Sequence, residues 1–189
     1  MPRLAVIVAS SRPGRIAVPV AEWFSGLARE HGGFEVDVVD LAEVGLPFLD
    51  EPNHPRLKQY EHDHTEAWSK RVEAADAFVV VTPEYNYGMP AILKNALDYL
   101  HHEWAYKPVA FVSYGGVSAG TRSVQMTKQV VTTLRMFPIP EAVAIPFVHQ
   151  FLDDEQRLVP NDVMAGAAKA VLDELVSVEQ ALRPLRRAS

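Results

Sequence analysis

The chain has 189 residues, of which 18 are basic and 24 acidic, so its formal net charge is −6 at pH 7. This length suits one domain with a full core, and we expect residues 1–189 to form a single domain. The acidic balance argues against a nucleic-acid-binding protein that depends on bulk positive charge. The chain has no cysteine, which excludes disulfides and thiolate catalysis. No apolar run reaches the roughly 18 residues of a membrane span, and a cytoplasmic protein is expected.

The first half of the chain predicts two strands and two helices. A short apolar run predicts a strand at Leu4–Ala9, and a helical pattern follows at about Arg15–Glu30. A second strand is predicted at Phe34–Asp40, where apolar and polar residues alternate. Residues 46–64 contain three prolines and predict an irregular excursion over the surface. A helix is then predicted at Thr65–Ala75, with its first residue as the N-cap.

The second half alternates strands and helices three times. Its predicted elements are, in order, a strand at Ala77–Thr82, a helix at Ala91–His101, a strand at Val109–Tyr114, a helix at Thr121–Met136, a strand at about Ala142–Phe147 and a helix at Asp162 to about Leu182. Such alternation is typical of an α/β fold with a parallel sheet. Five strands joined by right-handed crossovers form a three-layer sandwich.

The segment Ser10-Ser11-Arg12-Pro13-Gly14-Arg15 follows the first strand and opens the first helix. Hydroxyls, free amides at a helix N-terminus and guanidinium groups suit a phosphate dianion. The same residue types also form an ordinary turn and helix cap, so this loop alone leaves both interpretations open. The glycine patterns of dinucleotide-binding folds and of nucleoside triphosphatases are absent, so neither of those functions is supported.

Residues 82–90, with the sequence TPEYNYGMP, follow the strand predicted at Ala77–Thr82. They therefore lie at the carboxyl end of a strand, where open α/β sheets bind ligands. Two prolines and a glycine stiffen this loop, and its aromatic side chains beside backbone amides suit a flat ring with polar edges. We interpret the loop as one wall of a flavin site. The alternative is a tight turn with surface aromatics.

A third loop, residues 113–120 with the sequence SYGGVSAG, follows the next strand. Its glycines allow backbone N–H groups to approach a ligand closely, and such donors can hold carbonyl oxygens or a developing anion. Glycine-rich turns after strands are common, so this loop is informative only in combination. The three loops together match the phosphate, the ring face and the polar ring edge of one mononucleotide.

In these loops the chain resembles the NAD(P)H-dependent FMN reductases, or quinone reductases, of the flavodoxin-like superfamily. The resemblance extends from Leu4 to the region of Pro146. The motifs that carry it are Ser10-x-Arg12-Pro13-Gly14-Arg15, Pro83-Glu84-Tyr85-Asn86, Leu93-Lys94-Asn95-Ala96-Leu97-Asp98, and Lys107-Pro108 with Ser113-Tyr114-Gly115-Gly116. Family members usually have glycine at the position of Ala9, and many have serine where this chain has Arg15.

The resemblance implies a flavodoxin-like sandwich with the sheet order 2-1-3-4-5 and non-covalently bound FMN. The residues that it assigns to the phosphate are Ser10, Arg12, Arg15 and the amides of Ile16 and Ala17. Those that it assigns to the isoalloxazine ring are Pro83, Glu84, Tyr85 and Asn86, with the backbone of Glu84 more important than its carboxylate. Those that it assigns to the pyrimidine side are Gly115, Gly116, Val117 and Ser118, with Ser113 in the same loop.

The resemblance also implies ping-pong hydride chemistry. NADPH or NADH would pass a hydride to flavin N5 and leave, and a small acceptor such as free flavin or a quinone would then take its place. Positioning is the main contribution of the protein in such a reaction, so no side chain is assigned as catalytic. The alternatives are a flavodoxin-type electron carrier and a flavin-based sensor, neither of which turns over NAD(P)H rapidly.

Further expectations concern assembly and charged side chains. The resemblance implies a homodimer or homotetramer, with the helices after the second and third strands at the subunit boundary. The alternative of a surface zinc site involves His54, His62 and His64, or the pair His101-His102. Nothing fixes the ligand spacing, so solvated histidines and no bound metal are expected. Lys94 and Asp98 either form an exposed ion pair or, in the case of Asp98 together with Asn95, brace the loop at residues 83–88.

The last predicted helix ends in three arginines, at positions 183, 186 and 187. Cations suit the C-terminal end of a helix because they complement its dipole. We expect these arginines to form a solvated tail and not a nucleic-acid-binding patch.

Overall fold

A computed structural model describes residues 1–187 of the chain. Its centre is a five-stranded sheet in the order β2-β1-β3-β4-β5, and all neighbouring strands run parallel. The strands are β1 Arg3–Val8, β2 Glu35–Asp40, β3 Ala77–Thr82, β4 Pro108–Tyr114 and β5 Phe137–Ile145. The predicted α/β class, parallel sheet and strand order are confirmed.

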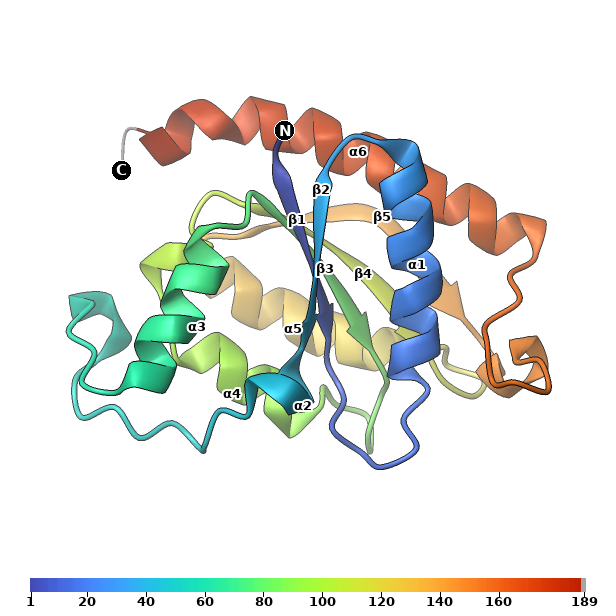
Figure 1. Cartoon of the computed structure of the whole chain (residues 1–189), viewed down its shortest axis with the longest axis horizontal. Coiled ribbons are helices and arrows are strands. Elements are labelled where there is room, and N and C mark those ends of the chain that lie inside the picture. Colours follow the sequence, from blue (N-terminus) through green and yellow to red (C-terminus); the bar gives the residue numbers. More distant parts are fainter. Residues whose placement is uncertain (188–189) are drawn as a thin grey trace.

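Helices cover both faces of this sheet, as Figure 1 shows. One face carries α1 (Ala17–His31) and α6 (Asp162–Arg187). The other face carries α3 (Asp63–Glu73), α4 (Ala91–Asp98) and α5 (Thr121–Thr133). A single turn, α2 (Leu41–Val44), follows β2, and short 3₁₀ turns lie at Pro55–Leu57, His102–Trp104 and Val148–Phe151. The predicted three-layer arrangement is confirmed.

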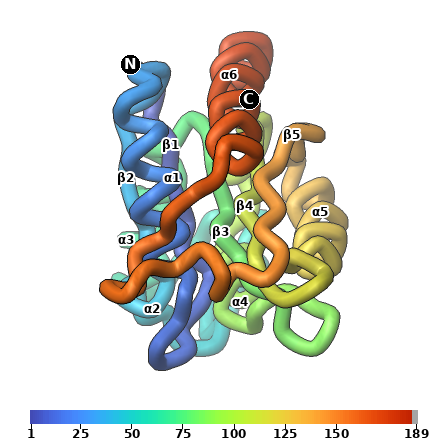
Figure 2. Tube along the Cα trace, turned by 90° about the vertical axis from the view of Figure 1, so that its right-hand side faces the viewer, coloured from blue at the N-terminus to red at the C-terminus, as the bar shows by residue number. Residues whose placement is uncertain are grey.

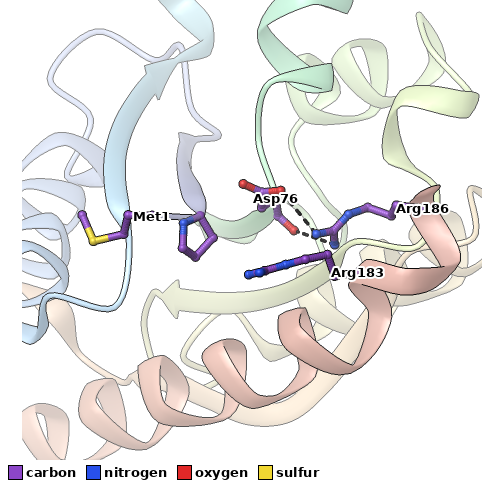
Figure 3. Close-up of a pocket in the computed structure, with 5 residues that line it drawn as sticks. Met1, Asp76, Arg183 and Arg186 are labelled. Carbon is purple, nitrogen blue, oxygen red and sulfur yellow. Dashed lines mark hydrogen bonds and ion pairs between the residues drawn. The ribbon is translucent and has the colours of Figure 1, made fainter.

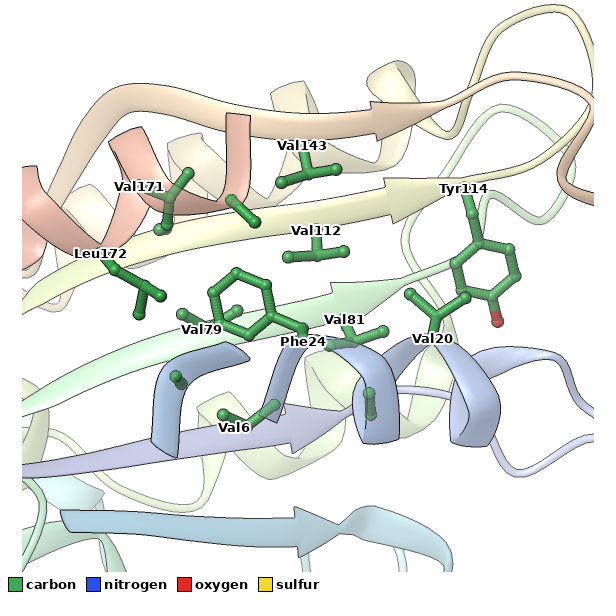
Figure 4. Close-up of a cluster of buried hydrophobic side chains, with 14 of the residues drawn as sticks. Val6, Val20, Phe24, Val79, Val81, Val112, Tyr114, Val143, Val171 and Leu172 are labelled. Carbon is green, nitrogen blue, oxygen red and sulfur yellow. The ribbon is translucent and has the colours of Figure 1, made fainter. Parts of the chain in front are cut away.

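Successive side chains of the central strands enter two separate cores. Val79 and Val81 of β3 pack toward α1 and α6, together with Phe24 and Leu172 from those helices (Figure 4). Phe78 and Val80 of the same strand enter the opposite core, which also contains Trp68, Leu93 and Trp104. Because both faces are covered, β3 is buried at every position, and its sequence is a continuous apolar run that ends in one threonine.

Two predicted details are wrong. Thr65 is not an N-cap, because α3 begins at Asp63 after His62, and Thr65 lies fully buried on the inner face of the helix. The fifth strand begins at Phe137, not Ala142, and therefore includes Pro138 and Pro140. β5 is an edge strand, so the N–H groups on its outer side have no neighbouring strand to bond, and proline is tolerated there. The pairing of β5 with β4 also shifts register once.

The predicted brace by Asn95 is also wrong. Its side-chain amide donates to the carbonyl of Pro47 at 2.7 Å, and its side-chain oxygen accepts from the amide of Leu49 at 3.0 Å. Asn95 therefore holds the proline-containing excursion against α4 and not the loop after β3. Lys94 and Asp98 form the alternative ion pair, at 2.5 Å on a half-exposed surface. Among residues 1–187, no helix is long and apolar enough to cross a membrane.

Candidate active site at the carboxyl edge of the sheet

The loops that follow β1, β3, β4 and β5 gather at one end of the molecule, at the bottom of Figure 2. Parallel strands place all their carboxyl ends on the same edge, so segments far apart in the sequence meet there. Two cavities open between these loops, with volumes of about 480 and 520 Å³. The sequence predicts a ligand site at this edge, and the structure places cavities of ligand size there.

The larger share of the predicted site residues line these cavities. The first cavity is bounded by the predicted residues Arg12, Ile16, Pro83, Glu84, Tyr85, Gly115 and Gly116. The second lies beside it and adds Ser11 and Asn86. Arg12, Glu84 and Tyr85 line both cavities, so these three side chains form the partition between them.

The loop after β1 presents unused hydrogen-bond donors. Among residues 1–187, the backbone amides of Ile16, Ala17 and Val18 donate to no protein acceptor, and no side chain caps the start of α1. The guanidinium of Arg12 forms no hydrogen bond or ion pair within the same residues, so it is available to a ligand. This end of the cavity is therefore rich in positive potential.

Arg15 behaves differently from Arg12. Its guanidinium pairs with the carboxylate of Asp40 at the end of β2, and both side chains are largely buried. Its Nε atom is buried without a partner. A buried donor without a partner is costly, and an anion at the start of α1 is the kind of group that would satisfy it.

The loop after β3 has a fixed backbone shape. Tyr85 and Gly88 exchange two backbone hydrogen bonds of 3.0 Å, and the two residues between them, Asn86 and Tyr87, have φ angles of 49° and 71°. Both φ angles are left-handed, as a type I′ turn requires. The phenol of Tyr85 points back to β1, where its oxygen lies 2.7 Å from the hydroxyl of the fully buried Ser10.

The carboxylate of Glu84 ties this loop to the next one. It accepts hydrogen bonds from the backbone amide of Arg122 at 3.0 Å and from Nε of the same residue at 2.5 Å. Ser118 donates to it at 3.4 Å. Partial burial raises the pKa of Glu84, but the hydrogen bonds from Arg122 outweigh this, so its pKa lies below the ordinary value. The guanidinium of Arg122 also stacks 3.7 Å from the ring centroid of Tyr87.

The loop after β4 is a glycine-containing turn, here called the glycine turn, and its glycines differ in whether a side chain would fit. Gly120 has a φ of 76°, and a Cβ there would lie 2.8 Å from the carbonyl oxygen of Tyr114, so this glycine is required by the fold. A Cβ on Gly116 would meet nothing within 4 Å. The amides of Gly116, Val117 and Ser118 donate to no acceptor within the described part of the chain. Ser113, in contrast, is buried within β4 and lines neither cavity.

Sequence reasoning missed a fourth contributor, the loop after β5. Phe147, Val148, His149 and Gln150 line the first cavity together with Tyr114. The prediction extended the fifth strand to Phe147, so the residues after it were not considered. The signal was available, because a fifth parallel strand must also end at the ligand-binding edge.

The opposite edge of the sheet holds another cavity, of about 430 Å³, lined by Met1, Pro2, Asp76, Arg183 and Arg186. Figure 3 shows the guanidinium of Arg186 beside Asp76, with an oxygen–nitrogen distance of 3.3 Å. Arg183 and Arg186 both pair with the buried carboxylate of Glu179. The expected solvated tail is therefore wrong for Arg186, which is largely buried and fastens the end of α6 to Asp76 beside β3, whereas Arg183 is half-exposed and pairs within α6. The side chain of Arg187 lies outside the described part of the structure.

His62 and His64 stack at 5.1 Å, and His64 bonds to Asp50 at 3.0 Å. Within residues 1–187, no group of three or more histidine, cysteine or acidic side chains is arranged to hold a metal ion.

The chain is similar to known flavin-dependent reductases. A family model described as NADPH-dependent FMN reductase matches residues 2–150. An NAD(P)H-dependent FMN reductase of Schizosaccharomyces pombe is 41% identical over 146 residues, which are 76% of this chain and 72% of that protein. An NAD(P)H-dependent FMN reductase of Saccharomyces cerevisiae is 33% identical over 156 residues, which are 76% of this chain and 81% of that protein.

Among solved structures, the flavoenzyme NAD(P)H:(acceptor) oxidoreductase FerB of Paracoccus denitrificans superposes with a TM-score of 0.76 at 20% identity, covering 96% of this chain and 98% of that one. At this identity the superposition shows the flavodoxin-like fold alone. The family model covers all of the first three loops at the cavity, and the match to the yeast proteins is well above chance similarity. The chain therefore belongs to the NADPH-dependent FMN reductase family.

Proposed function

We propose that this chain is an NAD(P)H-dependent oxidoreductase that holds FMN without a covalent bond and reduces a small acceptor, free flavin or a quinone. The observation that carries the proposal is the cavity of about 480 Å³ between four strand ends, which has unused amide donors at both its α1 end and its Gly116 end. A phosphate and the polar edge of a ring each need such donors. Residues 1–189 would form one FMN-binding domain.

The α1 end fits the phosphate. The free amides of Ile16 and Ala17, the free guanidinium of Arg12 and the unpartnered Nε of Arg15 all lie in one loop. Ser10 would contribute through its hydroxyl, which already bonds to Tyr85. Charge-assisted hydrogen bonds from such donors are roughly twice as strong as neutral ones.

The other loops fit the ring. Pro83, Glu84, Tyr85 and Asn86 would contact its face and one polar edge, held in place by the left-handed turn and by the Glu84–Arg122 pair. Gly115, Gly116, Val117 and Ser118 would offer amides to the pyrimidine side, with Ser113 supporting them from β4. The side chain of Glu84 is satisfied by Arg122, so its backbone is what remains for a ligand.

Bound FMN supplies the hydride chemistry by accepting two electrons from NADPH or NADH and returning them to the acceptor. The protein binds and orients both partners, with reacting atoms held about 3–3.5 Å apart. In the proposed ping-pong order, the nicotinamide leaves before the acceptor enters the same space. Tyr85, Asn86 and Tyr87 shape that space as walls, and no side chain of this chain needs to act as acid or base.

A flavodoxin-type electron carrier is the second candidate, since it would use the same fold and the same cofactor. The free guanidinium of Arg12 and the modest net charge of −6 favour a reductase over a carrier. We also propose a homodimer or homotetramer, in which exposed apolar side chains such as Phe48 on the excursion beside α4 would be covered. Light scattering at micromolar concentration tests this, and a monomer would contradict it.

The decisive experiment is an absorbance spectrum of the purified protein reconstituted with FMN, followed by anaerobic addition of NADPH. Flavin bands that bleach within seconds support the reductase, and reoxidation by flavins and quinones then ranks the acceptors. Bands that bleach only with dithionite would favour the carrier or a sensor. If no flavin binds after reconstitution, the proposed function is wrong.

A further inference from the structure

His149 is an ionisable side chain at the cavity that the reaction outlined above does not use. It lies in the short 3₁₀ turn Val148–Phe151 after β5 and lines the first cavity. Its imidazole makes no hydrogen bond or ion pair with any residue in the described range 1–187. Histidine side chains as a class change charge between pH 5 and 8.

The backbone holds His149 close to the glycine turn. The amide of Phe147 donates to the carbonyl of Gly116, and the amide of Val148 donates to the carbonyl of Gly115, both at 3.1 Å. Phe147 has a φ of 48°, which is unfavourable for a bulky residue and persists only where the surroundings impose it. The loop after β5 is thus fixed against the two glycines, and His149 follows directly.

The other ionisable groups at this cavity are engaged or remain in one charge state. Arg12 is cationic throughout, and Glu84 is held as a carboxylate by Arg122. Tyr85 bonds to Ser10, and burial raises the pKa of Tyr114 far above neutrality. On its own segment, Asp153 pairs with Arg157 and is not a partner of His149. His149 is therefore an ionisable side chain at this cavity that no protein group engages within residues 1–187.

We propose that the His149 imidazolium stabilises the negative charge that reduction places on the pyrimidine edge of bound FMN. This inference rests on the proposed function, in which Gly115 and Gly116 meet that edge. A hydride brings two electrons and one proton, so the charge of the ring system falls by one unit. A cation beside it then favours the reduced state, and by linkage the reduced state makes His149 hold its proton more tightly.

The test is an anaerobic spectroelectrochemical titration of the FMN-loaded protein between pH 5.5 and 8.5. The variants are His149→Gln, which removes the charge, and His149→Lys, which keeps it at both pH values. His31→Gln is the matched control, since His31 lies at the far end of α1 beside Asp173. The midpoint potential is an equilibrium readout and does not depend on turnover.

At pH 5.5 we expect the midpoint potential of bound FMN to be about 30 mV higher in wild type than in His149→Gln. For a two-electron couple, this shift means that the preference of the protein for reduced over oxidised FMN is about tenfold greater in wild type. The difference should vanish at pH 8.5 in the glutamine variant, while His149→Lys keeps the higher potential. Equal midpoint potentials in wild type and both variants would overturn the inference. Because all three proteins would still bind FMN, that outcome would not contradict the proposed function. If His149→Gln binds no FMN, the test depends on His149→Lys. A midpoint potential above that of wild type at pH 8.5 supports the proposed role of His149, and a midpoint potential equal to that of wild type overturns it.

Discussion

The hydroxyl oxygen of Ser10 lies 2.7 Å from the phenol oxygen of Tyr85, and this hydrogen bond joins the loop after β1 to the loop after β3. Ser10 is fully buried and its hydroxyl has no other partner among the described residues. The bond thus couples the segment proposed for the phosphate to the segment proposed for the ring. Removing one partner leaves a buried polar group unsatisfied, which costs more than the bond itself contributes.

Tyr85→Phe is expected to lower the free energy of unfolding of the FMN-free protein by about 1–3 kcal/mol, because the Ser10 hydroxyl loses its partner. Urea denaturation followed by circular dichroism measures this. In the double variant with Ser10→Ala, the loss should be smaller than the sum of the two single losses. Tyr106→Phe is the control, since its hydroxyl forms no hydrogen bond within residues 1–187. Additive single effects would show that the bond contributes nothing.

Substitutions of Arg12 and Arg15 should separate the effect on FMN binding from the effect on protein stability. Arg12→Ala removes a guanidinium without protein partners, so FMN binding should weaken about 10- to 100-fold while the unfolding free energy stays within about 0.5 kcal/mol. Arg15→Ala leaves the largely buried Asp40 unpaired, so it should also destabilise the FMN-free protein by about 1–3 kcal/mol. Fluorescence titration with FMN and urea denaturation check the two effects. Full flavin affinity in Arg12→Ala would contradict the phosphate assignment.

Substituting alanine for two glycines of the loop after β4 should have opposite effects on stability and FMN binding. In Gly116→Ala the new Cβ meets no protein atom within 4 Å, so stability should change by less than about 1 kcal/mol, whereas FMN binding should weaken because a ring edge would approach that position. Gly120→Ala should destabilise the FMN-free protein by more than about 1 kcal/mol, since its φ of 76° and the 2.8 Å contact with Tyr114 both oppose a side chain. If Gly116→Ala leaves FMN affinity unchanged, the ring does not lie against this turn.

Much of the fold could be predicted because local patterns and the global arrangement agree. Val79 and Val81 belong to one core, and Phe78 and Val80 to the other, so a continuous apolar run marks a strand buried on both faces. The start of β5 could not be predicted in this way. Its prolines argue against a strand unless it is known to lie at the edge of the sheet, and that depends on the order of all five strands.

The site was predicted at the level of loops and not of side-chain partners. The segments after β1, β3 and β4 carry recognisable residue types, so they could be assigned from the sequence. The pairing of Arg15 with Asp40 and that of Glu84 with Arg122 depend on how separate elements approach one another, which no spacing rule gives. The loop after β5, with His149, was missed because the fifth strand was predicted to extend to Phe147, so the residues after it were not considered.

Glu84→Gln tests the link between the loops after β3 and β4 through its pH dependence. The folded-state pKa of Glu84 lies below its ordinary value of 4.5, so the ionised carboxylate stabilises the fold above about pH 4.5, and this contribution is lost as the pH falls through the folded-state pKa. Wild type should exceed the variant by about 1–2 kcal/mol at pH 7, and the gap should be smaller at pH 3. Urea denaturation at both pH values measures this.

Glu66→Gln is the matched control for that experiment. Glu66 pairs with Lys70 on the exposed face of α3, where an ion pair contributes only a few tenths of a kcal/mol. Its difference from wild type should stay small at both pH values. A gap for Glu84→Gln that is the same at pH 7 and pH 3 would show that the Arg122 pair does not depend on the carboxylate charge.

Lys107 gives a second pH-dependent prediction, in the alkaline range. Its ammonium is buried at the amino edge of the sheet and donates to the carbonyls of Val72 and Glu73 at 2.9 and 3.1 Å, at the end of α3. Burial, and to a lesser extent Arg186, lower its pKa from 10.5 to about 8. Between these two values the unfolded chain binds more protons than the folded one, so stability rises with pH.

Between pH 7.5 and 9.5, the unfolding free energy of wild type should therefore rise by about 1–2 kcal/mol relative to that of Lys107→Met. Wild type loses its destabilising buried charge as the ammonium deprotonates, whereas the variant has no such charge to lose. Comparing the two proteins cancels the tyrosines that begin to titrate in the same range. Lys70→Met serves as control, since Lys70 is an exposed lysine on α3. Parallel stability curves for wild type and Lys107→Met would show that the ammonium keeps its proton, held by the carbonyls at the end of α3.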